Sequence, residues 1–167
     1  MDLFANQILR ELLPVEKEDL PPTASPKSGP PNPADHWSAA LLLERAAYLG
    51  KMARYGDGSA SETLKEYPQH CAMLSYRSRS GEAEAHENFA DIFFVIEGRA
   101  TLVTGGAIAN AQRVGPGEMR GSAVEGGARQ ELRAGDVVHV PAGVPHQMLV
   151  AGENSVACLV VKVQENP

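Results

Sequence analysis

The distribution of apolar and polar residues divides the chain into two parts of different character. Residues 2–13 place their apolar side chains on one face of a helix, with Asp2 as a candidate N-cap and Pro14 at the end. Residues 14–35 contain seven prolines, which exclude a helix or a central strand and indicate an extended linker or a surface strap. A second helix is expected over about 38–54, capped by Asp35 or Ser38.

From residue 71 the pattern changes to short apolar runs separated by glycine-rich turns. It predicts strands at 71–80, 82–87, 91–97, 99–104, 118–124, 129–133, 136–141, 146–150 and 155–163. Many short strands with turn signals this dense are typical of an antiparallel sandwich or barrel. The sequence shows no internal repeat and no nucleotide-binding glycine loop.

Composition and charge narrow the class of protein. Apolar residues make up 43% of the 167 residues and charged residues 22%, which is ordinary for a soluble globular domain. The net charge of −6 argues against nucleic acid or an anionic membrane as a partner. No apolar run could cross a bilayer, and the N-terminus lacks a basic n-region, so a cytoplasmic protein is expected. Cys71 and Cys158 are then expected to be buried free thiols.

Two segments carry candidate chemistry. In GDVVHVPAGVPHQMLV, residues 135–150, the spacing of Gly135, Pro141, Gly143 and His146 places an imidazole at the start of a strand that follows a tight turn. In HENFADIFFVIEG, residues 86–98, an aspartate precedes an apolar strand. An aspartate at that position is expected to lie close to a buried core.

These segments resemble the two motifs of the cupins. The second cupin motif is G, five residues, PxG, two residues, H, three residues, N, and this chain departs from it only at Val150, where the family has Asn. The first motif is G, five residues, HxH, three or four residues, E, six residues, G. Its positions correspond, in chain order, to Ser78, Glu84, His86, Asp91 and Gly98. The resemblance covers roughly residues 78–150 and leaves the first 70 residues outside it.

The resemblance implies an all-β, double-stranded β-helix (jelly-roll) barrel at 71–167. Residues 1–70 are expected, from their own pattern, to form an N-terminal extension of two helices joined by a proline-rich linker. The resemblance also implies a divalent metal inside the barrel and, commonly, a homodimer. Carried over by position, the metal ligands are Glu84, His86, Asp91 and His146. Such a mixed nitrogen and oxygen set suits Fe, Mn, Ni or Zn and leaves coordination positions open.

Less specific interpretations stay open for several of these residues. His86 could be a surface histidine, His146 a core or turn histidine, and Glu84 an exposed strand carboxylate. His139, two residues before Pro141, is a candidate catalytic acid or base if it faces the cavity, and otherwise a packed or surface histidine. Asn88 and Gln147 are candidate substrate contacts at the barrel mouth.

Three interpretations of the function stay open. The first is a metal-dependent enzyme acting on a small oxygen-bearing organic substrate by dioxygenase, isomerase or lyase chemistry. The second is a non-catalytic metal- or small-ligand-binding barrel, such as a sensor or storage module, which is favoured by the altered first motif. A third is a structural barrel whose site has decayed.

Overall fold

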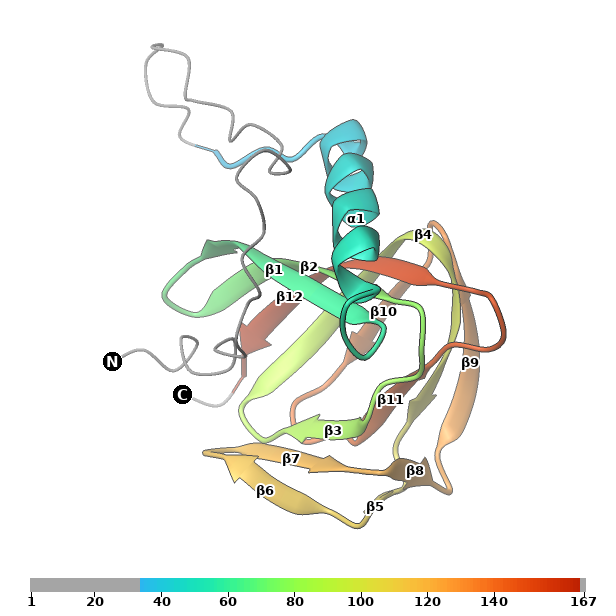
Figure 1. The fold of residues 1–167 in the computed structure, drawn as a ribbon. Coiled ribbons are helices and arrows are strands. Elements are labelled where there is room, and N and C mark those ends of the chain that lie inside the picture. The colour runs from blue at the N-terminus through green and yellow to red at the C-terminus, as the bar shows by residue number, and fades with distance from the viewer. Residues whose placement is uncertain (1–33, 166–167) are drawn as a thin grey trace. The chain divides into compact units, whose positions relative to one another are not determined.

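The computed structural model describes residues 34–165, which form an all-β barrel with one helix on its outer side (Figure 1). The fold class predicted from the sequence is confirmed for this part of the chain. The helix predicted at 2–13 and residues 14–33 of the proline-rich segment lie outside the described residues. Within 34–165, no helix combines the length and apolar character that a membrane span would need.

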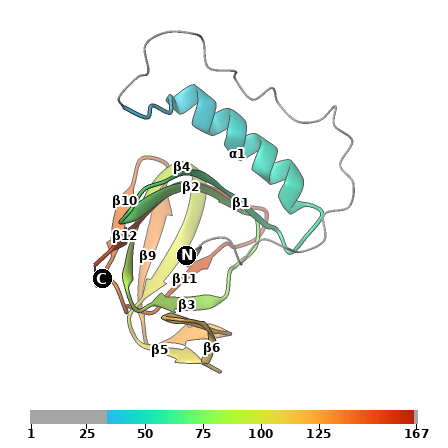
Figure 2. The same cartoon turned by 90° about the vertical axis from the view of Figure 1, so that its left-hand side faces the viewer.

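Helix α1 spans Ala39–Ala53 and confirms the second predicted helix. Ser38 is its N-cap, and its side chain accepts a hydrogen bond from the backbone N–H of Leu41 at 3.2 Å. The buried residues of the helix recur at helical spacing and are Leu42, Ala46, Leu49 and Ala53. They cover Leu74 and Ala157 on the outer face of the sheet, so the helix lies across β1 and β2 (Figure 2).

The strands are antiparallel, and most are short apart from the 16-residue β4. Their bounds are β1 Ser59–Glu66, β2 His70–Arg77, β3 Ala83–His86, β4 Phe89–Thr104, β5 Ala107–Ala109, β6 Gln112–Gly115, β7 Glu118–Gly121, β8 Ala123–Glu125, β9 Ala128–Arg133, β10 Val137–Val140, β11 His146–Leu149 and β12 Val156–Gln164. Strand β1 pairs with β2, so the sheet begins earlier in the chain than the predicted start at residue 71. Strands β5 and β6 were missed because they lie in a glycine-bearing connection.

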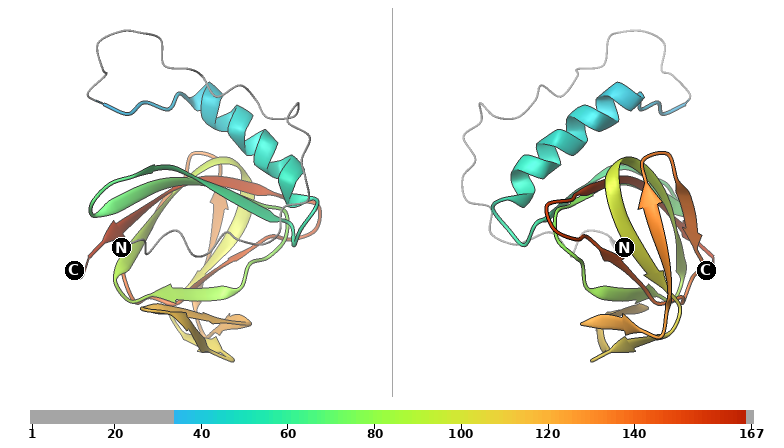
Figure 3. Two further views of the ribbon diagram at one scale, coloured as in Figure 1. Left: turned by 60° about the vertical axis from the view of Figure 1, so that its left-hand side comes forward. Right: turned by 90° about the vertical axis from the view of Figure 1, so that its right-hand side faces the viewer.

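Strand β4 joins the two halves of the barrel. Its first half pairs with β12 and β10, and its second half pairs with β9 and β11 (Figure 3). The change occurs at Gly98, whose φ is +80° and where a Cβ would lie 2.0 Å from the carbonyl oxygen of Ser155. Only glycine tolerates both conditions, so the two strands predicted at 91–97 and 99–104 become one bent strand.

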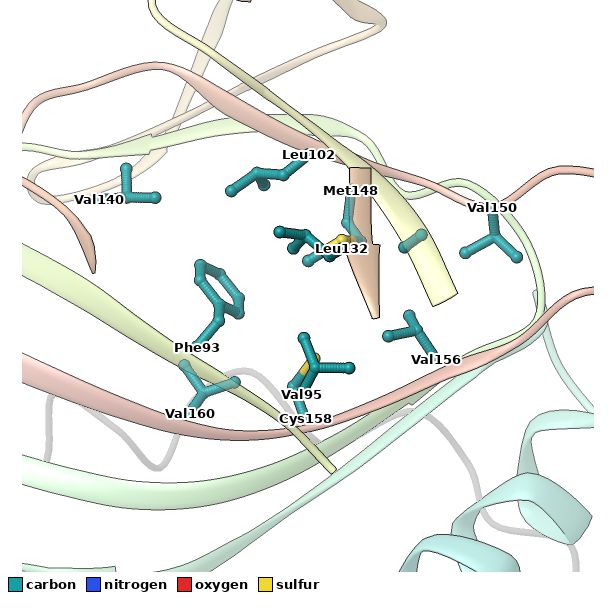
Figure 4. Close-up of a cluster of buried hydrophobic side chains, with 11 residues drawn as sticks. Phe93, Val95, Leu102, Leu132, Val140, Met148, Val150, Val156, Cys158 and Val160 are labelled. Atoms are coloured by element: carbon teal, nitrogen blue, oxygen red, sulfur yellow. The ribbon is translucent and has the colours of Figure 1, made fainter. Parts of the chain in front are cut away.

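The inner faces of the two halves meet in a hydrophobic core. Alternate residues of β4 and β12 point inward and contact residues of β9, β10 and β11 (Figure 4). The buried members include Phe93, Val95, Leu102, Leu132, Met148 and Cys158. This core fills much of the barrel and leaves a polar cluster beside Phe93, whose ring stands edge-on to His146 at 6.1 Å.

Candidate metal centre

Strand pairing brings five polar side chains from four strands to the inner face of the barrel. Glu84 and His86 lie two residues apart on β3, so they share a face. Register sets Glu84 opposite His146 of β11 and Asp91 of β4 opposite Lys162 of β12. Asp91 is 2% exposed, which makes it one of the most buried charged groups in the described residues. The predicted closeness of this aspartate to the core is therefore observed.

His86 uses its two ring nitrogens differently. Its Nδ1 lies 2.6 Å from Oε2 of Glu118, the residue opposite it on β7, and because a carboxylate only accepts, Nδ1 carries the proton. Its Nε2 lies 3.0 Å from Nζ of Lys162 and 3.4 Å from Oδ2 of Asp91. A carboxylate that orients a histidine through Nδ1 is a common arrangement behind metal-ligating histidines.

His146 has the same division of roles. Its Nδ1 donates to the carbonyl oxygen of Val144 at 3.1 Å. Its Nε2 is buried and makes no hydrogen bond to any described residue, and it lies 3.4 Å from Oδ2 of Asp91 and 3.5 Å from Oε1 of Glu84, within ion-pair distance. In the neutral ring this nitrogen carries a lone pair that a proton or a metal ion can take up beside the two carboxylates.

The carboxylates of buried Asp91 and half-buried Glu84 are held in the charged form. Burial raises the pKa of Asp91, but His146, His86 and the Lys162 ammonium outweigh it and hold the pKa far below the ordinary range. Burial likewise opposes ionisation of Glu84, and His146 and His86 overcome it and lower the pKa to about 2. Both groups therefore offer anionic oxygens at neutral pH.

The pKa values of the two histidines are raised, whereas those of the two carboxylates are lowered. Burial lowers the pKa of His146, yet Asp91 and Glu84 raise it to about 9. Burial also lowers the pKa of His86, and Asp91 and Glu118 raise it above the ordinary value. The cluster is therefore an electrostatically strong site for a cation, whether that cation is a proton, an ammonium group or a metal ion.

Three side chains meet the geometric condition for a metal site. One donor atom each from Glu84, His86 and His146 lies within 4.8 Å of the others. Two imidazoles and one carboxylate match the donors that Fe, Mn, Ni and Zn accept, and the orphaned Nε2 of His146 fits a metal bond. Asp91 contacts the same cluster, but both its oxygens accept from Lys162, at 2.8 and 3.0 Å.

Sequence reasoning missed Lys162, a member of the cluster, and Glu118, which orients His86. Lys162 shares the inward face of β12 with Cys158 and Val160, so strand alternation could have placed it inside the barrel. Glu118 begins a strand after a glycine turn and gave no signal, because its proximity to His86 depends on β3–β7 pairing.

The structure does not bring His139 to the cluster. On β10 it alternates with Val140, which is buried, and its own side chain is 53% exposed, with Nε2 3.5 Å from Oε1 of Glu165. It borders a surface hollow lined by β9 and β10 rather than the barrel interior. The condition for its predicted acid–base role, an inward orientation, is therefore not met.

The two predicted substrate contacts take other positions. Asn88 is exposed in the turn between β3 and β4, where its backbone oxygen accepts from Glu165. Gln147 is buried on the face of β11 opposite to His146. Its amide accepts from the N–H of Val124 at 3.1 Å and donates to the carbonyl of Gly81 at 2.9 Å, so it cross-links neighbouring segments.

A family model and one solved structure support the barrel fold. A family model described as "Cupin domain" matches residues 117–162. The structure of TT1209 from Thermus thermophilus is 16% identical, with 73% of this chain and 93% of that chain covered and a TM-score of 0.50. An oxalate oxidase in complex with glycolate is 17% identical, with 69% and 55% covered and a TM-score of 0.49.

A cupin superfamily protein from Desulfitobacterium hafniense is 15% identical, with 64% of this chain and 78% of that chain covered and a TM-score of 0.45. A sequence search of curated proteins gives no match. At such identities the structural likeness concerns the fold alone. The chemistry of the cluster therefore has to follow from its own residues.

Proposed function

We propose that the chain is a cupin-like barrel that binds one divalent transition metal ion through Glu84, His86 and His146, and the match of a cupin domain model to residues 117–162 supports this. The observation that carries this proposal is the pair of histidines whose Nδ1 atoms are engaged elsewhere, while the buried Nε2 of His146 faces the carboxylates of Asp91 and Glu84 and has no hydrogen-bond partner among the described residues. With Glu84 they form a set of two imidazoles and one carboxylate. Asp91, predicted as a fourth ligand, joins only if Lys162 releases it.

We further propose that the metal-bound protein acts on a small oxygen-bearing organic molecule by dioxygenase, isomerase or lyase chemistry. Three protein donors leave positions at which a bound metal polarises a substrate oxygen or activates water or O2. The protein's part is to keep Glu84 ionised and to fix the plane of the His86 ring through Glu118. Glu84 also lies 3.7 Å from the guanidinium of Arg120, which supplies a cation beside the site.

A second candidate function is a metal- or small-ligand-binding barrel without turnover, such as a sensor or storage module. One observation favours it: Lys162 already neutralises Asp91 and contacts Nε2 of His86. An internal cation of this kind balances the charge of the metal-free barrel. The protein can therefore alternate between a metal-free and a metal-bound form without any turnover of a substrate. The identity of the metal separates the two functions, because dioxygenase chemistry requires a redox-active ion whereas a binding module tolerates zinc.

The first test is elemental analysis of the protein purified without added metal or an affinity tag. It should be compared with the His86→Ala/His146→Ala double variant and with His139→Ala as a matched control that removes an imidazole from the outer face. We expect one transition metal ion per chain in the unmodified protein and in His139→Ala, and none in the double variant.

A redox-active metal would justify measuring oxygen uptake with small hydroxy and keto acids. Zinc lost in the same way would keep the site and favour lyase, isomerase or binding roles. No metal in any sample, even after reconstitution with Fe(II), Mn(II), Ni(II) and Zn(II), would overturn the proposal and leave a structural barrel.

A further inference from the structure

We infer that Lys162 is an internal cation that competes with the metal ion for Asp91 and His86, so that metal binding requires the ammonium group to move away. This inference rests on the proposed metal site, and it concerns a residue outside the motifs from which that site was predicted. Lys162 lies on the last strand, 16 residues after His146 in the sequence.

The contacts of Lys162 are those of a bound cation. Its Nζ donates to both oxygens of Asp91, at 2.8 and 3.0 Å, and lies 3.0 Å from Nε2 of His86. An ammonium group has three N–H donors and no acceptor capacity, so these three contacts account for all of them. Lys162 therefore uses two of the four groups that the sequence motifs assign to the metal.

A metal ion at His86 cannot coexist with this arrangement. Nε2 of His86 has one lone pair, and the ammonium group contacts it; a metal bond would need the same lone pair. Two cations close to one another also repel strongly in a buried site of low dielectric. The ammonium group must therefore leave Nε2 before His86 can coordinate a metal ion. Breaking the contacts of Lys162 costs free energy and so weakens metal binding.

The contact between Lys162 and Asp91 follows from the register of strand pairing. Asp91 and Lys162 are direct cross-strand partners in the β4–β12 ladder, and both side chains are on the inward face. Lys162 is also 21% exposed, whereas Asp91 is 2% exposed. The lysine has a flexible four-carbon stem and partial access to solvent, so its ammonium group can be displaced without unfolding the strand.

The experiment measures the affinity for metal after the competing charge is removed. Protein made metal-free with a chelator is titrated with Zn²⁺ and with Mn²⁺ by calorimetry. Lys162→Met and Lys162→Gln keep the approximate size of the side chain without its charge, and Lys51→Met removes an exposed lysine of α1 as the matched control. Circular dichroism establishes that each variant is folded.

We expect both Lys162 variants to bind metal about tenfold to a hundredfold more tightly than the unmodified protein, the range set by losing charge-assisted hydrogen bonds. Lys51→Met should bind like the unmodified protein. Equal affinity of the Lys162 variants and the unmodified protein would overturn the inference and leave the proposed metal site standing.

Two further outcomes separate the inference from the proposed function. Binding by the folded Lys162 variants, with none by the unmodified protein, would support the inference and overturn a native metal-dependent function. No binding by any folded protein would overturn both.

A second measurement uses the unmodified chain and does not depend on the variants folding. Reductive methylation of lysine amines is followed by mass spectrometry with and without Zn²⁺. We expect Lys162 to be methylated faster when metal is bound, because its ammonium group no longer bridges Asp91 and His86. Lys51 should be methylated at the same rate with and without Zn²⁺. Metal binding that leaves the labelling of Lys162 unchanged, or slows it, would overturn the inference.

Discussion

His86 and His146 each use Nδ1 to hold the ring and leave Nε2 facing the cluster. For His86 the holder is the carboxylate of Glu118 at 2.6 Å, and for His146 it is the backbone oxygen of Val144 at 3.1 Å. Fixing one nitrogen decides the tautomer and the direction of the other. At the scale of single residues, the orientation of both proposed ligands therefore depends on partners outside the proposed donor set.

Removing Glu118 tests this dependence. Glu118→Ala should weaken metal binding about tenfold or more, because the His86 ring loses its orienting partner and part of its basicity. Calorimetric titration of the metal-free protein measures the change. Glu153→Ala, which removes an exposed carboxylate from the turn before β12, should leave the affinity unchanged. Equal affinities in both variants would show that Glu118 does not position His86.

Gln147 provides a residue-scale prediction about stability. Its buried amide bonds to Val124 and Gly81, so Gln147→Ala leaves a backbone donor and acceptor without partners. We expect the free energy of unfolding to fall by about 2–3 kcal/mol. Urea unfolding measures this loss, and Gln130→Ala, on an exposed position of β9, should change it by less than about 0.5 kcal/mol. A similar small change for both variants would contradict the structural role of Gln147.

At the scale of elements, β4 determines the arrangement of the site. Its first half carries Asp91 and pairs with β12, and its second half pairs with β11, the strand that carries His146. The bend at Gly98 lets one strand serve both halves of the barrel. The cluster therefore depends on a turn-like conformation in the middle of a strand, seven residues after Asp91 in the sequence.

A pair of glycine variants tests this bend. Gly98→Ala should lower the free energy of unfolding by about 3 kcal/mol, because a positive φ is combined with a Cβ that meets the Ser155 carbonyl. Gly135→Ala is the matched control, since its φ is +96° but a Cβ there meets nothing within 4 Å. Gly135→Ala should lower the free energy of unfolding by only about 1 kcal/mol. Equal losses in thermal or urea unfolding would mean that the close approach at Gly98 is relieved cheaply.

At the scale of the whole molecule, the thiols report on the integrity of the barrel. Cys71 and Cys158 are both buried and free. Burial raises the pKa of Cys71, and it raises that of Cys158 to about 12. Ellman's reagent at pH 8 should therefore find almost no reactive thiol in the folded protein and two per chain in denaturant. Rapid reaction of the folded protein would show that the barrel opens readily.

The same shift predicts how stability depends on alkaline pH. The folded state keeps the Cys158 proton more tightly than the unfolded chain, whose thiol ionises near pH 9. Its contribution to stability is therefore complete below pH 9 and is lost as the pH rises toward 12, by up to about 1.4 kcal/mol per pH unit. Urea unfolding at about pH 8 and about pH 10 measures the loss, and Cys158→Ala should remove this part of the pH dependence.

The homodimer implied by the family resemblance stays a prediction. Phe94 on β4 and Val137 on β10 are cross-strand partners on the outer face, 37% and 58% exposed. An exposed apolar pair on adjacent strands suits a contact with a second copy of the chain. If the chain is a dimer through this face, Phe94→Glu should convert it to a monomer in sedimentation experiments. A dimer that is unaffected by Phe94→Glu would place the interface elsewhere.

The sequence by itself determined the barrel class, the helix over about 38–54 and the identity of the clustered histidines. Strand alternation put Glu84 and His86 on one face, and the turn before His146 placed that residue at a strand start. These are local properties of a few residues, so they can be read without knowing which strands pair.

Only the tertiary structure decided which face of each strand is inward and which residues oppose one another. It turned His139 outward, engaged Gln147 in backbone contacts and set Lys162 opposite Asp91. Register between strands separated by about 70 residues of sequence depends on the packing of the entire core, which no local pattern encodes. For that reason strand alternation could indicate that Lys162 lies inside the barrel, but its contacts with Asp91 and His86 were decided by the tertiary structure alone.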